Sequence, residues 1–366
     1  MQRGSFHGAG GTLLGMQIVN VCLTIVTLGA YHFWAKAKIR RYLFSQTAFA
    51  GDRFAYHGTG KELYQGFLKA TVVFGIPYFS LGAAHSFLAL PQSVDFLLQA
   101  MAALVLFLYV PVAIVNARRY RCTRTSWRGI RFSFRGRTVD FLKLYFKGWL
   151  FTLLTLGTYY PYFQTQRQAF LHSHTYFGNQ RFQFTGHGSG LMVPFAVTLF
   201  TTYAVLCLCG LALALQLTNA GLTLLLIPFV LGPVWVWLLG QKQKYYWDHT
   251  TFGEARFSSS ITWQKLFGLY LGNLALLLLT LGWAWPWVTV RNARFFIGTL
   301  SLQGLTDLDR VLQDTTETSV PGEGLSHLLA GRMQDQVVTF VHGIPGLAVL
   351  PPGPTPPNPG ALPSRP

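Results

Sequence analysis

Residues 266–290 read LFGLYLGNLALLLLTLGWAWPWVTV and contain no charged side chain. A second run, LTLLLIPFVLGPVWVWLL at 222–239, is also free of charge. An apolar run of about 18 residues or more is long enough to cross a hydrocarbon core roughly 30 Å thick. These two stretches therefore predict helices that are solvated by lipid.

The composition of the whole chain agrees with this prediction. Of 366 residues, 51% are hydrophobic and only 11% are charged, whereas soluble domains carry about 25% charged residues. We therefore expect an all-α polytopic membrane protein rather than a soluble helical one. Seven apolar segments can be drawn, at about 13–34, 66–88, 95–116, 142–163, 191–215, 220–240 and 266–290.

The chain also repeats itself. The tripeptide Thr-Leu-Gly occurs at 27–29, 155–157 and 280–282, and an Arg-Phe-x-Phe/Tyr-x-Gly motif follows the first two copies. Recurring motifs at a long, regular spacing indicate a repeat architecture. We predict a duplicated three-span unit followed by a partial third copy, with short Arg-Phe-x-Phe strand or turn segments in the loops. The copies cover about 5–115, 130–240 and 255–305.

Two regions follow from the composition. Residues 1–305 form the predicted membrane domain. Residues 306–366 carry several acidic side chains and end in a proline-rich sequence. Such a segment cannot bury enough apolar surface to fold, so we predict a disordered tail.

The net charge of +17 comes mainly from bursts of Lys and Arg that follow apolar runs. This placement is typical of loops at a membrane surface, where they meet anionic lipid headgroups, and does not indicate nucleic-acid binding. The loop 35–64 holds six Lys/Arg and its second-copy equivalent, 164–189, holds two. Because cytoplasmic loops accumulate Lys and Arg, this difference favours an inverted second copy. The N-terminus would then be periplasmic and the tail cytoplasmic.

A rival geometry stays open. The Arg-Phe motifs look alike in every copy, which is natural if all of them face one side of the membrane. The Thr-Leu-Gly segments would then be re-entrant and would return to the same face at the glycine. Irregular backbone at membrane depth is tolerated where protein buries it.

Polar residues within apolar segments are the default candidates for a function. Asn20 and Asn273 precede Thr-Leu-Gly in the first and third copies and could line a polar path, although their type and position favour an interhelical hydrogen bond that only joins helices. Thr-Leu-Gly could supply a bend or expose carbonyl groups to a substrate. The speculative substrate path therefore comprises Asn20, Asn273, Thr27, Gly29, Thr155, Gly157, Thr280 and Gly282.

A second set of candidates is basic or aromatic and sits where apolar segments end, at the depth of the lipid headgroups. We expect these residues to be interfacial: Trp34, Lys38, Arg40, Arg41, Arg53, Arg131, Arg181, Trp287, Arg291 and Arg294.

Few motifs in the sequence indicate catalysis or metal binding. His172 and His174 form an H-x-H pair without an accompanying carboxylate, and the glycines near Lys61 lack the Walker spacing. No paired carboxylates lie inside an apolar segment. We expect no enzyme activity, no cofactor and no metal ion.

Several motifs carry a family resemblance. Phe6-x-Gly8, the stretch 27–36 (TLGAYHFWAK), Arg40-Arg41-Tyr42 and the stretch 54–63 (FAYHGTGKEL) resemble the YjgN family of bacterial inner-membrane proteins. The resemblance covers roughly residues 5–305 and implies a multi-pass protein of the bacterial inner membrane. It supplies no substrate and no catalytic residue. The second copy departs from the pattern, with Gln166 and Ala169 in place of Lys38 and Arg41.

Two functions compete at this level. An inverted repeat is the architecture of many secondary transporters, and the scarcity of charge inside the spans favours a neutral or amphipathic solute. The alternative is a non-transporting scaffold that binds lipid or a partner through its basic aromatic cytoplasmic loops. Membrane lipids are the one partner that the sequence implies.

Overall fold

Strands and helix pairs alternate along the part of the chain that the computed structural model describes, residues 2–304 apart from 88–90 and 217. The predicted disordered tail lies outside the described residues. The strands are β1 (Gln2–Phe6), β2 (Thr47–Phe49), β3 (Asp52–Tyr56), β4 (Thr125–Trp127), β5 (Ile130–Phe134), β6 (Thr175–Phe177), β7 (Gln180–Phe184), β8 (Thr250–Phe252), β9 (Ala255–Ser259) and β10 (Leu300–Gln303).

These short strands close into one antiparallel barrel in the order β1-β10-β9-β8-β7-β6-β5-β4-β3-β2. Two-residue turns join β2 to β3, β4 to β5, β6 to β7 and β8 to β9. In the first turn Ala50 and Gly51 both have positive φ, 52° and 89°, as the type I′ turns of tight hairpins require. Every other connection between neighbouring strands runs through a pair of helices, except that β10 pairs directly with β1 to close the sheet.

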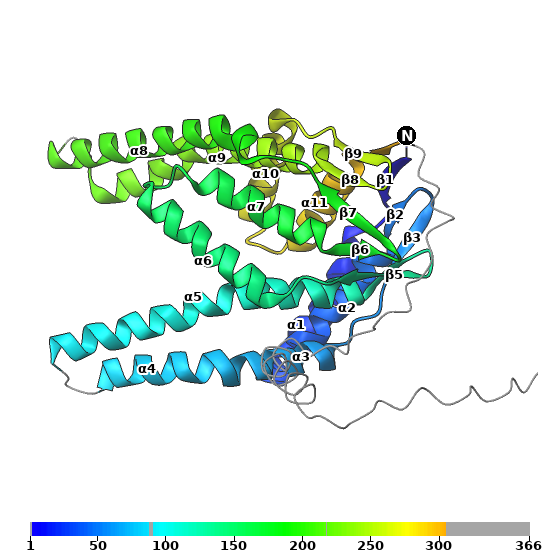
Figure 1. Ribbon diagram of the computed structural model, residues 1–366, viewed down its shortest axis with the longest axis horizontal. Coiled ribbons are helices and arrows are strands. Elements are labelled where there is room, and N and C mark those ends of the chain that lie inside the picture. The colour runs from blue at the N-terminus through cyan, green and yellow to red at the C-terminus, as the bar shows by residue number, and fades with distance from the viewer. Residues whose placement is uncertain (1, 88–90, 217, 305–366) are drawn as a thin grey trace, which may run out of the picture. The chain divides into compact units, whose positions relative to one another are not determined.

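The five helix pairs leave the barrel and return to it (Figure 1). The outgoing helices are α1 (Gly10–Val26), α3 (Gly60–Ala70) continued by the π-helical turn η1 (Thr71–Gly75) and α4 (Ile76–Phe87), α6 (Thr138–Leu154), α8 (Met192–Ala214) preceded by the short helix η2 (Gly188–Leu191), and α10 (Trp263–Leu279). The helices that lead back, called the return helices below, are α2 (His32–Ser45), α5 (Gln92–Thr123), α7 (Tyr160–Ser173), α9 (Ala220–Asp248) and α11 (Trp285–Gly298).

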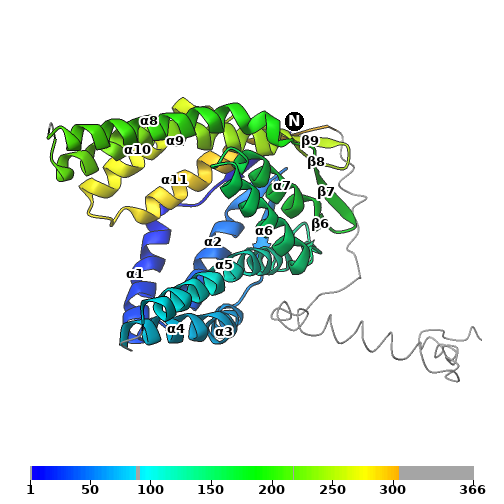
Figure 2. The ribbon, with the colours of Figure 1, turned by 60° about the vertical axis from the view of Figure 1, so that its left-hand side comes forward.

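Neighbouring helix pairs contact one another around a ring. Contacts join α2 to α3, α5 to α6, α7 to α8, α9 to α10 and α11 back to α1. Within the second and fourth pairs the long helices lie side by side, α4 against α5 and α8 against α9 (Figure 2). The ring of helices therefore follows the same circular order as the barrel strands.

The helix pairs differ in length. Helices over 60–87, 92–123, 188–214 and 221–248 are long and apolar enough to cross a membrane. By contrast α1 has 17 residues, which corresponds to about 26 Å and falls short of a hydrocarbon core of roughly 30 Å. Pairs two and four supply the four candidate spans, and pairs one, three and five are short.

The short pairs reverse at Thr-Leu-Gly. In the first of them Leu28 and Gly29 have φ of 50° and 92°, and the Gly29 N–H donates to the Thr24 carbonyl oxygen at 2.7 Å. The Thr27 hydroxyl donates to the Leu23 carbonyl oxygen at 2.7 Å and accepts from the Tyr31 N–H at 3.0 Å. These bonds satisfy the end of one helix and the start of the next, in the manner of a Schellman motif. The turns at Leu156 and Leu281 have the same φ signs.

Aromatic side chains fill the barrel. Inward residues pair across strands, Phe54 with Trp127, Phe132 with Phe177 and Phe182 with Phe252. Ring centroids in the second and third of these pairs are 4.8 Å apart. Phe257 pairs with Leu302 in the same layer, and Trp127, Phe177, Phe252, Phe257 and Leu302 belong to one buried core. A barrel filled with side chains in this way is a packed core rather than a pore.

The all-α prediction is therefore wrong. The Arg-Phe segments, predicted as short strand or turn segments in separate loops, are strands β3, β5, β7 and β9 of one closed sheet. Three of the seven predicted apolar segments, 13–34, 142–163 and 266–290, are each two helices joined at Thr-Leu-Gly. Hydropathy cannot detect these reversals because the turns are themselves apolar.

The closed barrel bears on the predicted membrane topology of the helix pairs. Each helix pair begins and ends at the same sheet, which agrees with the re-entrant alternative and gives the inverted arrangement no support. Gln2 pairs with Leu302, so the two ends of the described chain lie on one side of the protein. The predicted periplasmic N-terminus and cytoplasmic tail stay predictions, since the tail lies outside the described residues. The sequence repeat itself stays a prediction.

Candidate binding surface at the junction of barrel and helices

The return helices carry cationic side chains close to the barrel. Each is followed, after one residue, by a strand whose inward residue is Phe49, Trp127, Phe177, Phe252 or Leu302, the last residue of its strand in every case but the last. Eight residues before these positions stand Arg41, Arg119, Ala169, Lys244 and Arg294. The sequence analysis named Arg41 and Arg294 as interfacial, and alignment on the strands shows that Arg119 is their counterpart.

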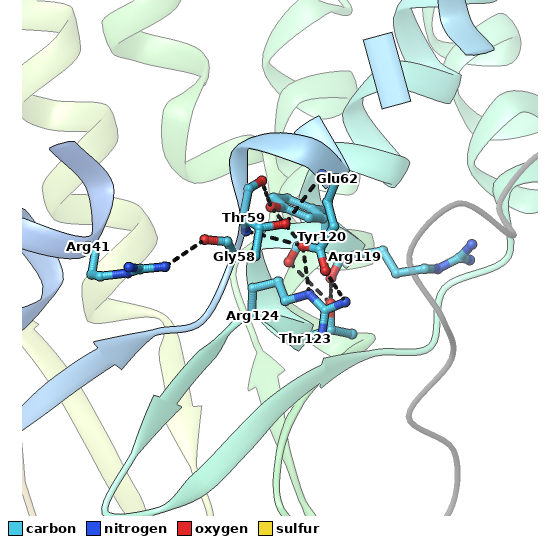
Figure 3. Close-up of polar contacts among 8 residues, drawn as sticks. All are labelled: Arg41, Gly58, Thr59, Glu62, Arg119, Tyr120, Thr123 and Arg124. Carbon is cyan, nitrogen blue, oxygen red and sulfur yellow. Dashed lines mark hydrogen bonds and ion pairs between the residues drawn. The ribbon is translucent and has the colours of Figure 1, made fainter. Parts of the chain in front are cut away.

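Three of these arginines join neighbouring helix pairs. Nη2 of Arg41 donates to the Gly58 carbonyl oxygen at 3.5 Å, as Figure 3 shows, and Nη2 of Arg119 donates to that of Gly136 at 2.9 Å. Arg294 makes the corresponding bond to Gly8 at 3.3 Å. Each glycine lies just before the outgoing helix of the next pair around the ring. These arginines therefore stabilise the ring, a role that the interfacial prediction did not include.

The glycines are required by packing. A Cβ built on Gly58 would lie 2.3 Å from Oη of Tyr56 and 2.6 Å from Oη of Tyr120. Gly136 and Gly186 meet Phe134 and Phe184 in the same way, at 2.7 and 2.6 Å. The Gly that ends each Arg-Phe-x-Phe/Tyr-x-Gly motif therefore lets the aromatic residue two positions earlier fold beneath it.

The start of α3 is fixed by a polar network (Figure 3). Thr59 and Glu62 form a reciprocal capping box. Glu62 also pairs with Arg124, with Nη2 to Oε1 at 2.8 Å, and accepts from the Tyr120 hydroxyl at 3.2 Å. The stretch His57–Glu62, which fails the Walker pattern, is thus a helix start. The spacing Thr-x-x-Glu at 59–62 in the sequence is typical of such a capped helix start.

Two tryptophans of the interfacial set also pack between helix pairs. A Cβ on Gly60 would lie 2.5 Å from Cγ of Trp34, and one on Gly10 would lie 2.4 Å from Cδ1 of Trp287. Both tryptophans remain about two-fifths exposed, at 40% and 41%. They therefore combine a packing role with an exposed face. Lys38 is exposed, and Arg291 is exposed with its guanidinium next to Gly272.

A ring of five arginines surrounds the barrel on its outside. Each precedes by three residues the last residue of its strand, and all five are exposed: Arg3, Arg53, Arg131, Arg181 and Arg256. Their cross-strand partners include Ala48 for Arg53, Ser126 for Arg131 and Thr251 for Arg256. The side chains of Arg53, Arg131, Arg181 and Arg256 therefore point away from the aromatic core, since alternate residues of a strand face opposite sides. Arg53, Arg131 and Arg181 were among the predicted interfacial residues, and Arg3 and Arg256 were not, although each stands three residues before the end of its strand.

The predicted substrate path is not assembled in the described structure. Thr27, Gly29, Thr155, Gly157, Thr280 and Gly282 lie in the three turns at the far ends of the short pairs. Asn20 and Asn273 are buried within α1 and α10, and no described hydrogen bond joins them. Asn273 donates from Nδ2 to Oδ1 of Asn292 at 2.8 Å, which is a bond within the fifth helix pair. Within residues 2–304, leaving out 88–90 and 217, no group of three or more metal-ligating side chains is found.

Comparisons with known proteins match the chain to one protein family and to several relatives. The family model described as "Bacterial protein of unknown function (DUF898)" matches residues 1–328. The chain is 35% identical over 130 residues to a protein of Escherichia coli O157:H7 called Inner membrane protein YjgN, and 32% identical to the protein of that name in Escherichia coli K12. Each alignment covers 35% of this chain and 30% of the relative. The matched part thus spans less than a third of these relatives' length. No solved structure matches the chain.

Proposed function

Since this chain belongs to the bacterial family DUF898, the YjgN family that its motifs resemble, we propose that it is a multi-pass inner-membrane protein that holds anionic lipid at the cytoplasmic face. The location rests on the printed name of the relatives and on the four helices that are long and apolar enough to cross a membrane. In this proposal the barrel lies at the cytoplasmic surface and the helix pairs enter the bilayer from it.

The distribution of charge supports this orientation. The helix-pair turns remote from the barrel, at 27–31, 155–159 and 280–284, contain no Lys or Arg. The return helices and the barrel strands carry most of the Lys and Arg residues. Because positive side chains accumulate on the cytoplasmic side, the barrel side is the cytoplasmic one in this proposal.

The exposed arginine ring is the observation that carries the proposal. Five arginines at equivalent positions face outward from a barrel whose interior is already filled with aromatic side chains. Each arginine lies three residues, or roughly 10 Å along the strand, from the end of that strand nearest the helices. This distance slightly exceeds the screening length of about 8 Å at physiological ionic strength. Each arginine therefore contributes only part of the roughly 1 kcal/mol of attraction of a cation at an anionic surface, and the five contributions together favour anionic over zwitterionic headgroups.

Transport has less support. Its main argument was an inverted repeat, and all helix pairs return to a single barrel. The packed interior also favours a structural hub over a conduit through the sheet. The hypothesis of a transporter for a neutral or amphipathic solute stays a prediction, and the scaffold alternative becomes the proposal.

The test compares two lipids with matched acyl chains. Full-length protein in detergent is heated with added phosphatidylglycerol or phosphatidylcholine, and the unfolding temperature is measured. We expect phosphatidylglycerol to raise it more. Replacing Arg3, Arg53, Arg131, Arg181 and Arg256 together by Gln should remove most of this difference, whereas replacing the same five by Lys should preserve it. Equal stabilisation by both lipids, or a difference that survives in the Gln variant, would refute the proposal.

A further inference from the structure

A second group of cations lies on the return helices and is separate from the exposed ring. It comprises Arg118 and Arg121 on α5 and Arg40 on α2, together with His172 at the end of α7 and Thr175 at the start of β6, and is called the Arg118 cluster below. Arg121 is within electrostatic range of both Arg118 and Arg40, and Arg118 is within range of His172. The cluster therefore joins three helix pairs at the end of the barrel from which the helices emerge.

Arg118 reaches across from α5 to the first residue of β6. Its Nη2 donates to Oγ1 of Thr175 at 3.3 Å. Its Nε is fully buried and has no hydrogen-bond partner among the residues that the structure describes. A buried donor without a partner costs about 1–3 kcal/mol, and more for a charged group. The guanidinium is thus held in place on one side and left unsatisfied on another.

No carboxylate of the described residues compensates the Arg118 cluster. The described ion pairs use other partners: Glu62 with Arg124, Asp52 with Arg128, and Asp95 with His85. The Arg121 Nε donates only to the Ala117 carbonyl oxygen of its own helix, at 3.1 Å. Like charges within electrostatic range repel, and the penalty is largest for Arg118, whose Nε lies buried, since a buried charge without a partner costs several kcal/mol.

The nearest imidazole does not compensate this charge either. Burial, and secondarily the charge of Arg118, lower the pKa of His172 to about 4. At neutral pH His172 is therefore uncharged and neither adds to the repulsion nor offsets it. Its ring lies near Phe184 and Trp247, with centroids 5.9 and 6.4 Å away, so the aromatic core of the barrel borders the cluster.

We propose that Arg118, with Arg40 and Arg121, binds a phosphoryl group between the return helices, supplied by a phospholipid headgroup or by free phosphate. Guanidinium groups match phosphate oxygens as planar, bidentate donors, and the free Nε of Arg118 belongs to such a fork. The Thr175 hydroxyl already orients the other side of the same guanidinium. An anion here relieves the repulsion among three arginines and satisfies the buried donor at once. This site does not depend on the lipid-holding function proposed for the exposed ring.

The experiment uses the full-length protein in a phosphate-free, non-ionic detergent. Inorganic phosphate, phosphatidylglycerol, acetate or chloride is added at matched ionic strength, and thermal unfolding is followed. Stabilisation by inorganic phosphate identifies a free-anion site, and stabilisation by phosphatidylglycerol alone identifies a headgroup site; either result supports the proposal. Acetate or chloride acting as strongly as both phosphoryl compounds would overturn it, as would the absence of any effect.

Substitutions locate the site. Arg118→Gln should abolish the phosphoryl effect and, without an added anion, should leave the protein as stable as before or more stable, because it removes a repelling charge. A purely structural Arg118 would instead make the anion-free protein less stable. The matched control Arg137→Gln removes an exposed arginine at the start of α6 and should retain the full response. A response that persists in Arg118→Gln would contradict the assignment.

A conservative variant guards against misfolding. Arg118→Lys keeps the charge but loses the fork, so we expect phosphoryl affinity to fall about tenfold or more, as the loss of one charged hydrogen bond implies. Unchanged affinity in Arg118→Lys would count against the proposal. The Gln variant of the five ring arginines should keep its response to inorganic phosphate, which separates failure of this site from failure of the proposed function.

Discussion

Arg294 of the last return helix donates from Nη2 to the carbonyl oxygen of Gly8, 3.3 Å away, just before the first outgoing helix. The bond spans the chain closure at which β10 meets β1. It repeats the bonds of Arg41 to Gly58 and of Arg119 to Gly136, which lie between pairs that follow each other in sequence. The same arginine-to-glycine hydrogen bond thus joins the last helix pair to the first and joins successive pairs along the chain.

Removing the Arg294 side chain should weaken this closure. We expect Arg294→Gln to lower stability by about 1 kcal/mol, less than the roughly 1.5–3 kcal/mol of a hydrogen bond to a charged group, because the arginine is exposed. The measurement is thermal unfolding in detergent. Arg256→Gln, which removes an exposed arginine from the outside of β9, is the control and should have a smaller effect. Equal losses in the two variants would show that the bond to Gly8 contributes nothing specific.

Gly148 and Phe163 form a size-matched pair within the third helix pair. A Cβ built on Gly148 would lie 2.0 Å from Cδ2 of Phe163, a ring that is 1% exposed. We expect Gly148→Ala to destabilise the protein by about 1–3 kcal/mol, the usual cost of overpacking a core. Gly210→Ala is the control, since a Cβ there meets nothing within 4 Å.

The same pair allows a test of coupling. The position of Gly148 is held by Asn20 in the first helix pair, and that of Phe163 is held by Ala35. The double variant Gly148→Asn with Phe163→Ala recreates that combination. It should be more stable than the sum of the two single effects predicts, by a coupling energy of about 0.5–3 kcal/mol. Strict additivity would mean that the two sites do not pack as described.

The barrel predicts which positions share a side of the membrane. In a variant without the native Cys22, Cys122, Cys207 and Cys209, a single cysteine is placed at Asn179, Glu254 or Thr218. Positions 179 and 254 lie in turns of the barrel, and 218 lies in the turn between α8 and α9. With an impermeant thiol reagent, 179 and 254 should react from the cytoplasm and 218 from the periplasm. Reaction of 179 and 254 from opposite sides would rule out a single barrel.

His172 should make stability depend on pH. Burial lowers its folded-state pKa to about 4, below the unfolded value of about 6.5, so the unfolded chain binds the proton more tightly. Stability is therefore complete above about pH 6.5 and falls as the pH drops from there towards 4, by on the order of 3 kcal/mol in all. Unfolding temperatures at pH 7.5 and 5 measure the effect. His172→Gln should reduce the difference and His174→Gln should not. If both variants kept the full pH dependence, another group would be responsible.

The candidate surface was only partly visible in the sequence. The interfacial set included Arg41, Arg53, Arg131, Arg181 and Arg294 because local patterns place basic residues beside apolar runs. Arg3 and Arg256 were missed although the spacing to the last residue of the strand is the same for all five ring arginines. Arg118 was missed for a different reason, because its importance comes from a neighbour on another strand, Thr175, which no local pattern shows.

The amino-acid sequence by itself determined that lipid solvates the long apolar runs. It also determined where the chain turns back on itself. Charge-free runs such as 222–239 can be buried only in lipid or in a very large core, and hydropathy reads this directly. The Thr-Leu-Gly triplets bend the chain wherever they occur, since the bonds that form each turn lie within about four or five residues of it.

Only the tertiary structure decided that the strands close into one barrel. Strands of three to five residues are too short to show a clear alternation, and partners such as Phe54 and Trp127 are separated by an entire helix pair. Pairing across such distances is set by how all the helix pairs pack around the ring, because no single strand can satisfy its backbone hydrogen bonds alone. Because of that closure every described helix pair begins and ends at one barrel, an arrangement that agrees with the re-entrant alternative.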